Sequence, residues 1–315
     1  MDQIVTFTGA RDHILRLNIL PILLRETDES EPIAIREQSL QLITSLISCK
    51  PPPPLEDISP TLAVLMDFAK FSKTKSMIDN ACSALFYLLD ASFLPESVQH
   101  QICTIAVGLL NCPWESVQHK ALSLIQLVTF QTDIQTGIAF SCSALPALQL
   151  LLETASASQE ILQQVCLNLG HILAGSERQI EAAINAGVIE TLSAQLDNPD
   201  IMIRTGALWA ISKATARGSS TQIQQLVDKG FVDKIWPKLA SEKDTKILLL
   251  TLKCIKNIVM RGIDLKSSRA DGRNPYVVHI EGLGGLKYLD KLLRHQQLQL
   301  RLKCCDLLPL FAKDH

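Results

Sequence analysis

The residues of this chain that could do chemistry do not form a catalytic or metal-binding pattern. The sequence has no H-E-x-x-H, no G-x-S-x-G and no P-loop. Its seven histidines are not spaced as metal ligands, and the glycine-rich segment 281–285 lacks the preceding strand and following lysine of a phosphate loop. That segment predicts a turn at the start of a helix. We therefore expect no enzymatic activity, no metal ion and no cofactor.

The composition favours a folded, helical protein. Of 315 residues, 47% are hydrophobic, which excludes disorder over most of the chain. Only 5% are aromatic, and such an aliphatic core is more typical of helices than of sheets. The net charge of −2 disfavours a nucleic-acid-binding protein that depends on overall positive charge, so we expect no direct nucleic-acid partner.

Charge is distributed unevenly along the chain. Residues 251–315 contain 12 Lys and Arg against 6 Asp and Glu, whereas the preceding 250 residues contain 18 against 26. Two interpretations remain open. The asymmetry is either ordinary variation of a polar surface, or it indicates an acidic body that attracts basic partners.

The cysteines and the N-terminus favour an intracellular protein. None of the nine cysteines forms a C-x-x-C pair, and Cys82, Cys103, Cys166 and Cys254 lie inside apolar runs, which predicts buried free thiols. No targeting segment follows Met1. Apolar runs such as residues 247–250 are far shorter than the roughly 20 residues that span a bilayer, so no membrane partner is expected.

A pattern of small, polar and apolar residues recurs six times along the chain. One position of the pattern, here called the anchor, recurs at separations of 42, 40, 44, 42 and 44 residues. A period near 42 is typical of helical HEAT and armadillo repeats. The anchors are Gln41, Ser83, Ser123, Leu167, Trp209 and Lys253.

Each period contains signals for three helices. Pro21, Pro60 and Pro146 open apolar runs, which suits proline at the first helical position. Gly187 and Gly230 suit tight turns that need a positive φ. A short polar link then precedes a longer helix that carries the anchor. Three helices in about 42 residues favour the armadillo layout over the two-helix HEAT layout.

The predicted fold is an all-α, right-handed armadillo superhelix of about seven repeats in a single domain. Third helices would line a concave groove, with each anchor and the residue four later on one face. Trp114 and Trp236 lie outside the anchors and are expected to pack in the core, and Pro237 predicts a kink or late start in its helix. The repeats are predicted at residues 17–56, 57–97, 98–140, 141–183, 184–226, 227–270 and 275–315.

Several segments resemble the armadillo domain of importin-α (karyopherin-α), the adaptor of nuclear protein import. The resemblance is strongest in A-I-N-A-G-V, A-L-W-A-I-S-K-A-T and N-P-Y, and it extends over nearly the whole chain. It implies binding of nuclear localisation signals, which are peptide segments of cargo proteins, and a location in cytoplasm and nucleus. The segments begin at Ala183, Ala207 and Asn274.

The N-terminal part departs from the family. Arg11 and Asp12 resemble the link after the family's third repeat, so the chain would cover roughly the fourth to tenth repeats. The family's basic importin-β-binding arm has no counterpart, since Arg11 and Arg16 are the only Lys or Arg among the first 16 residues. We expect no autonomous recruitment of importin-β.

The groove departs from the family as well. The family presents Trp at the anchor and Asn four residues later, so that indoles hold the stems of signal Lys and Arg and amides hold the peptide backbone. The resemblance implies a peptide-binding groove in which Trp209 and Asn257 are retained and Lys213 places a cation where a basic ligand would lie. Trp209 also has a purely structural interpretation, as an indole packed between neighbouring third helices. The remaining candidate groove residues are Ser83, Tyr87, Ser123, Leu167 and His171.

Two functional hypotheses follow. The first is an importin-α-like adaptor whose binding of standard basic signals is weakened or altered. The second is an armadillo scaffold that has lost import activity or competes with full-length adaptors. Trp209 and Asn257 favour the first hypothesis. The second is favoured by the anchors Gln41, Ser83, Ser123 and Leu167.

Overall fold

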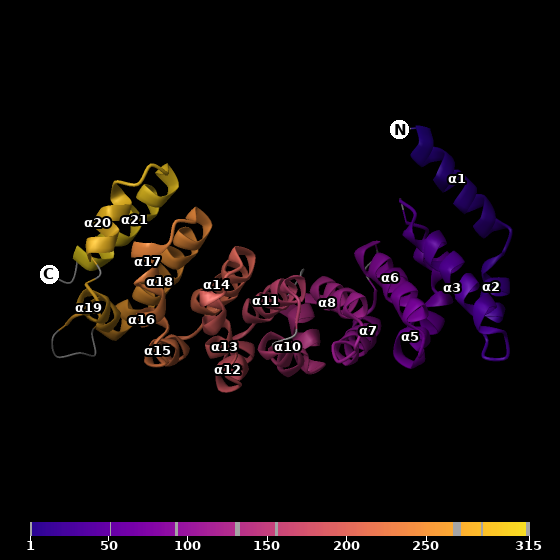
Figure 1. The fold of residues 1–315 in the computed structure, drawn as a ribbon, viewed down its shortest axis with the longest axis horizontal. Coiled ribbons are helices and arrows are strands. Elements are labelled where there is room, and N and C mark those ends of the chain that lie inside the picture. The colour runs from indigo at the N-terminus through magenta and orange to yellow at the C-terminus, as the bar shows by residue number, and fades with distance from the viewer. Residues whose placement is uncertain are drawn as a thin grey trace. The chain divides into compact units, whose positions relative to one another are not determined.

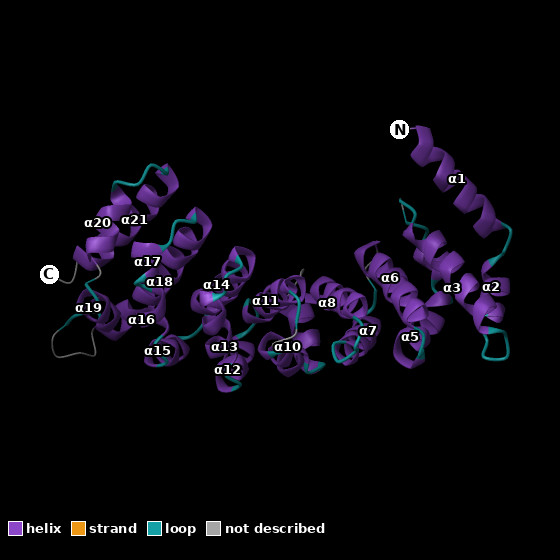
Figure 2. Ribbon diagram, viewed as in Figure 1, coloured by secondary structure: helices purple, strands orange, loops and turns teal. Residues whose placement is uncertain are grey.

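The computed structural model describes residues 2–50, 52–91, 94–129, 133–154, 157–266, 272–284 and 286–312. All regular elements in these ranges are helices, as Figure 2 shows, so the all-α prediction is confirmed. The chain divides into two compact units, Met1–Ala147 and Leu148–His315, and each is described by itself. Within the described ranges, none of the helices has both the length and the apolar character needed to cross a membrane.

Unit 1 is built from three long helices that pack on one another and shorter helices that pack against them. The long helices α3, α6 and α8 are consecutive neighbours, and α5 and α7 pack on α6 and α8 (Figure 1). The elements are α1 (Asp2–Arg16), α2 (Leu20–Glu26), α3 (Ile33–Ser48), α4 (Leu55–Ile58), α5 (Thr61–Phe71), α6 (Lys75–Ala91), α7 (Glu96–Leu109), α8 (Glu115–Thr129) and α9 (Asp133–Ser141), while α10 (Ala144–Glu153) crosses the boundary between the units.

Unit 2 repeats a three-helix layout more regularly. Its long helices α11, α14, α18 and α21 form a continuous stack in which each contacts the next (Figure 1). Three shorter helical segments precede α14 and α18, and two precede α21. The elements are α11 (Gln159–Leu173), α12 (Glu177–Asn185), α13 (Val188–Ala194), the short 3₁₀ helix η1 (Gln195–Asp197), α14 (Ile201–Arg217), α15 (Ser220–Asp228), α16 (Phe231–Ile235), α17 (Lys238–Ser241), α18 (Thr245–Lys266), α19 (Pro275–Gly282), α20 (Leu286–Leu293) and α21 (Leu298–Ala312).

Glycines and a proline determine how the shorter helices of unit 2 meet. Gly187 joins α12 to α13 with φ +80°, and Gly230 joins α15 to α16 with φ +75°, a conformation that costs other residues about 1–2 kcal/mol. Both predicted turns are confirmed. Pro237 caps α17, so the second helix of that repeat is interrupted between α16 and α17, as its position predicted.

Three details of the sequence interpretation are wrong. Arg11 and Asp12 lie inside α1 and not in a link, since residues 10–16 contain no glycine or proline to end a helix. Between α6 and α8 the described residues contain a single helix, α7, where the layout predicted two. Pro60 is the N-cap of α5 and Pro146 is the third residue of α10, so neither occupies the first helical position.

The core is aliphatic, and its cysteines behave as small apolar residues. Cys82, Cys103, Cys166 and Cys254 are buried free thiols, as predicted. Trp236 is completely buried, with its ring 6.4 Å from those of Tyr288 and Phe311, which confirms its packing role. Trp114 is half-buried. Gly285, in the predicted glycine-rich turn, lies outside the described residues, while Gly284 before it has φ +74°.

Candidate functional site

The anchors of unit 2 lie on three consecutive long helices. Between each anchor and the residue four later, neighbours such as Leu169, Ala210 and Cys254 are buried, because the helical period turns them toward the core. The anchors and their partners remain half-buried or exposed. We call this surface the third-helix face of unit 2, and its residues are Leu167 and His171 on α11, Trp209 and Lys213 on α14, and Lys253 and Asn257 on α18.

Trp209 packs against the neighbouring helix while staying partly accessible. A Cβ placed on Gly170 of α11 would lie 2.2 Å from Cζ3 of the indole, so the ring rests directly on the helix backbone there. The ring of His171 lies 5.4 Å from the indole in an edge-to-face arrangement. Both interpretations of Trp209 therefore have structural support, because the indole contacts α11 and is half-exposed at the third-helix face.

Lys213 lies over the same indole. Its Nζ is 4.7 Å from the centre of the Trp209 ring, within the range of a cation–π interaction. Burial lowers the pKa of Lys213 below its ordinary value, and the charge of Lys253 on α18 lowers it further. The indole that would accept a ligand cation therefore already holds a cation of the same chain.

His171 is held in its neutral form. Burial lowers the pKa of its imidazole below 6.5, and the charge of Lys213 adds to that shift. A neutral imidazole beside Trp209 can exchange hydrogen bonds with a ligand, but it adds no positive charge at neutral pH.

Asn257 is partly engaged within the protein. Its Nδ2 donates a hydrogen bond to Oγ1 of Thr215, a buried residue of α14, over 3.2 Å. The side-chain carbonyl and the second amide hydrogen are not used in that bond. The amide is thus oriented by α14 and half-exposed at the third-helix face.

In unit 1 the corresponding anchor is occupied by a lysine of the next long helix. Nζ of Lys120 on α8 donates to Oγ of Ser83 over 2.6 Å and to the carbonyl of Asp79 over 2.8 Å, both on α6. The Asp79 carboxylate lies 3.9 Å from Lys120 and accepts a hydrogen bond from Ser116. At this anchor, the cation therefore has an acidic partner.

The other predicted groove residues of unit 1 are less suited to grip a side chain. The hydroxyl of Ser123 donates to the carbonyl of His119 one turn earlier, over 2.9 Å. Tyr87 is half-buried, and its ring contacts that of Phe86 edge to face at 5.8 Å. Tyr87 supplies the aromatic surface at this face, whereas Ser123 supplies only a small polar group.

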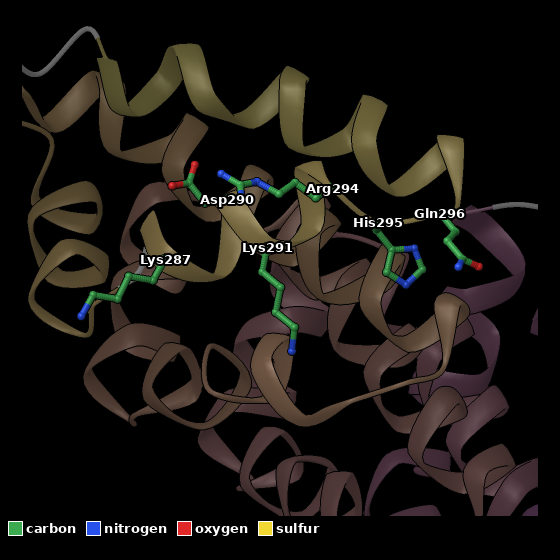
Figure 3. A pocket seen from close by; sticks show the side chains of 6 residues that line it. All are labelled: Lys287, Asp290, Lys291, Arg294, His295 and Gln296. Carbon is green, nitrogen blue, oxygen red and sulfur yellow. The ribbon is translucent and has the colours of Figure 1, made fainter.

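A separate cationic pocket lies on α20, outside the long helices. It has a volume of about 800 Å³, and Nζ of Lys291 donates to the carbonyl of Ala240 over 3.1 Å. Figure 3 shows its side chains on α20 and the turn that follows. They are Lys287, Asp290, Lys291, Arg294, His295 and Gln296. In the described part of the chain, no group of three or more His, Cys, Asp or Glu residues is placed to hold a metal ion.

The sequence did not indicate the roles of Gly170 and Lys120. Gly170 precedes His171 and admits the indole, and only the small size of glycine could have pointed to a close contact there. Lys120 lies three residues before the anchor Ser123 and reaches back 37 residues to Ser83. In the sequence, only its position within the repeat could have indicated that contact.

The helix triplets and the close-packed long helices define the class of protein, an armadillo-repeat solenoid. Residues 176–216, from the start of α12 through most of α14, match the family described as Armadillo/beta-catenin-like repeat. A designed armadillo repeat protein in complex with the peptide (KR)4 superimposes with a TM-score of 0.59 at 22% identity, covering 86% of this chain and 99% of that one. An engineered protein gives a TM-score of 0.75 at 19% identity, over 97% of this chain and 71% of the other. These likenesses show the fold.

The sequence relatives are importin alpha subunits. Importin subunit alpha-4 of Arabidopsis thaliana is 29% identical over 292 residues, which cover 92% of this chain and 54% of the relative. Importin subunit alpha-1a of Oryza sativa subsp. japonica is 29% identical over 306 residues, which cover 96% of this chain and 58% of the relative. The resemblance to importin-α is thereby confirmed over nearly the whole chain. The chain spans little more than half the length of these relatives.

Proposed function

We propose that this protein is an importin-α-like adaptor that binds peptide segments of other proteins along its third-helix faces. One observation carries the proposal. Trp209 and Asn257, the aromatic and amide groups that the resemblance assigns to peptide binding, lie half-exposed on the adjoining helices α14 and α18. Such peptides would be signals on cargo destined for the nucleus, and the protein would act in cytoplasm and nucleus without catalysis.

Binding of a standard basic signal is proposed to be weak. An exposed cation–π contact contributes about 0.5–1 kcal/mol, and each 1.4 kcal/mol changes affinity tenfold. Anchors such as Ser83, Ser123 and Leu167 cannot make that contact. At Trp209, the ammonium group of Lys213 already lies over the indole ring. A signal that depends on several aromatic slots therefore loses several orders of magnitude in affinity here.

Titration of immobilised monopartite and bipartite basic signals tests the adaptor proposal. Micromolar or tighter binding that is lost in both Trp209→Ala and Asn257→Ala supports it, provided that both variants retain the wild-type thermal unfolding profile. Binding that neither substitution affects contradicts the assigned face. A parallel pull-down with importin-β measures whether this chain recruits it directly.

The alternative is a scaffold that has lost import activity or that competes with full-length adaptors. Two lysines of the chain itself favour this alternative. Lys120 contacts the anchor Ser83 and Lys213 contacts the anchor Trp209, and a cargo lysine would need the same positions. An import assay in permeabilised cells separates the two. The adaptor delivers a labelled cargo to nuclei, whereas the competitor only slows delivery by a full-length importin-α.

A further inference from the structure

Helices α14 and α18, which carry most of the surface proposed to bind peptides, have an excess of positive charge in their sequences. Together they contain eight Lys and Arg residues and a single acidic residue, Asp264. Most of α18 lies in residues 251–315, where Lys and Arg outnumber Asp and Glu, whereas α14 is a basic helix within the acidic first 250 residues. The charge of the two helices disfavours a basic peptide, since like charges brought together at an interface cost affinity.

Lys213 and Lys253 form the centre of this positive charge. Lys253 is exposed on α18, one helical turn before Asn257, and the Asn257 amide donates a hydrogen bond to Thr215 of α14, two residues after Lys213. The two lysines therefore lie on packed neighbouring helices, and the charge of Lys253 lowers the pKa of Lys213. Among the described residues, no carboxylate forms an ion pair with either of them. The two ammonium groups repel each other across adjoining helices, and a carboxylate placed between them would relieve that repulsion.

A nearby lysine of α18 and lysines of other long helices lie close to carboxylates, unlike these two. Lys256 of α18 lies 3.6 Å from the Asp306 carboxylate of α21, and Lys303 lies 3.9 Å from the same group. In unit 1, Lys120 has the Asp79 carboxylate at 3.9 Å. Lys213 and Lys253, beside Trp209 and Asn257, have no such carboxylate partner among the described residues.

We infer that the third-helix face of unit 2 binds an acidic peptide segment, with an Asp or Glu carboxylate held between Lys213 and Lys253. Apolar neighbours of that carboxylate would contact Leu167 and the exposed part of Trp209, and the Asn257 amide would meet the peptide backbone. This inference rests on the proposed peptide-binding function and reverses the charge of the expected ligand. It contrasts with the designed armadillo protein whose peptide is (KR)4.

Fluorescence anisotropy with three labelled peptides of equal length tests the inference. One peptide alternates Glu with Ala, one alternates Lys with Ala, and one alternates Gln with Ala. The acidic peptide is expected to bind the whole chain most tightly, and its affinity is expected to fall as salt is raised, because the attraction is between charges. Tighter binding of the basic peptide would overturn the inference.

Substitutions locate the binding. Lys213→Gln and Lys253→Gln are each expected to weaken the acidic peptide by about five- to tenfold, between the effects of an exposed and a desolvated charge pair. Lys287→Gln is the matched control, because it removes the same charge from an exposed position on α20 and not from the third-helix face. An equal loss in Lys287→Gln would show attraction to net charge alone and would refute the site.

A variant with the two lysine charges reversed tests the site by a gain of binding as well as by a loss. The double variant Lys213→Glu with Lys253→Glu is expected to lose the acidic peptide and to bind the basic one. A double variant that still prefers the acidic peptide would refute the site. If the thermal unfolding of the double variant differs from that of the wild type, the affinities of the Lys213→Gln and Lys253→Gln variants decide whether the site is correct. A single-stranded DNA oligonucleotide that binds more tightly than the acidic peptide would overturn the choice of ligand class.

The same titrations separate this inference from the proposed function. Basic-peptide binding that depends on Trp209 supports the adaptor and refutes the acidic ligand. Acidic-peptide binding that depends on Lys213 and Lys253 supports the inference. If none of the three peptides binds in a way that depends on Trp209 or Asn257, the peptide-binding function itself is wrong.

Discussion

Nζ of Lys213 lies 4.7 Å from the centre of the Trp209 ring, one helical turn further along α14. The protein thus places its own cation on the aromatic surface that a basic ligand would use. In unit 1, Lys120 likewise occupies the Ser83 anchor, where its Nζ donates to the serine hydroxyl. A ligand lysine has to displace these side chains before it can bind, so each arrangement acts as an internal competitor.

Removing that competitor should change the preference of the face. Lys213→Met exposes the indole and deletes one repelling charge, so the affinity for the basic peptide is expected to rise by about three- to tenfold, which corresponds to one exposed cation–π contact plus reduced repulsion. Anisotropy titration measures the change. Lys287→Met, with the same loss of charge on α20, should leave the affinity nearly constant. Equal affinities in Lys213→Met and wild type would show that Lys213 does not compete.

The neutral His171 predicts a specific pH dependence of stability. The pKa of His171 is lowered in the folded protein by burial and by Lys213, whereas in the unfolded chain it is near 6.5. Below about pH 6.5 the unfolded state therefore binds more protons, and stability falls as the pH falls toward the folded pKa. Urea midpoints at pH 7.5, 6.5 and 5.5 should show this loss.

His171→Gln is expected to reduce that pH dependence, because glutamine does not titrate. His13→Gln, which removes an exposed histidine on α1, is the matched control and should keep the wild-type slope. If the curves of His171→Gln and wild type run parallel from pH 7.5 to 5.5, His171 is not the group responsible.

The contact between Gly170 and Trp209 predicts a large effect of a single methyl group. The Cβ of Gly170→Ala would lie 2.2 Å from Cζ3 and 2.5 Å from Cε3 of the indole, so the ring must move. We expect a destabilisation of about 1–3 kcal/mol, as for other overpacked sites, and a shift in tryptophan fluorescence. Gly108→Ala in α7 meets no atom within 4 Å and should instead stabilise by up to about 1 kcal/mol. Equal melting temperatures for the two variants would contradict the packing.

The repeat period made the long helices and the anchors of the face predictable. A residue and the one four positions later share a helix face whatever the surrounding sequence, so Trp209 with Lys213 and Lys253 with Asn257 lie together as expected. The turns at Gly187 and Gly230 followed from the steric freedom of glycine. Local physical rules were sufficient for these features.

Contacts between repeats were not predictable from the same rules. The reach of Lys120 to Ser83 depends on the distance between α6 and α8 and on the rotamer of a long side chain, which no local pattern specifies. The positions of Arg11 and Asp12 inside α1 had the opposite cause, because there a local rule was sufficient. Their resemblance to a family link outweighed the absence of a helix-breaking residue around them, and local helix propensity decided the outcome.

Asn274 joins two elements of unit 2 and is expected to be important for its stability. It is buried as the N-cap of α19, where its Oδ1 accepts from the Tyr276 amide over 3.0 Å and its Nδ2 donates to the Val259 carbonyl over 2.8 Å. Asn274→Ala removes the cap and deprives that buried carbonyl of a donor, for an expected loss of about 2–4 kcal/mol. Chemical denaturation measures it.

Two further variants separate the contributions of Asn274. Asn274→Asp keeps the cap acceptor and loses the donor to Val259, so it should also destabilise. Ser219→Ala removes the half-exposed N-cap of α15 and should cost about 1 kcal/mol or less. An effect of Asn274→Ala no larger than that of Ser219→Ala would show that the bond to Val259 contributes little.

Cys142 is expected to be the most reactive thiol among the half-buried cysteines. A hydrogen bond from Cys103 and another from Thr104, whose Oγ1 lies 3.3 Å from its Sγ, help to lower the pKa of Cys142 to about 6. At pH 6.5 most of it is thiolate, whereas an ordinary thiol with a pKa of about 8.5 is about 1% thiolate. Because a thiolate of low pKa is also less nucleophilic, we expect iodoacetamide to modify Cys142 roughly tenfold faster than the exposed Cys305.

Peptide mass spectrometry over time measures both rates of modification. The Cys103→Ala substitution should slow the modification of Cys142 at pH 6.5 and leave that of Cys305 unchanged. Equal rates at the two sites in the wild-type protein would show that Cys103 and Thr104 do not stabilise the thiolate.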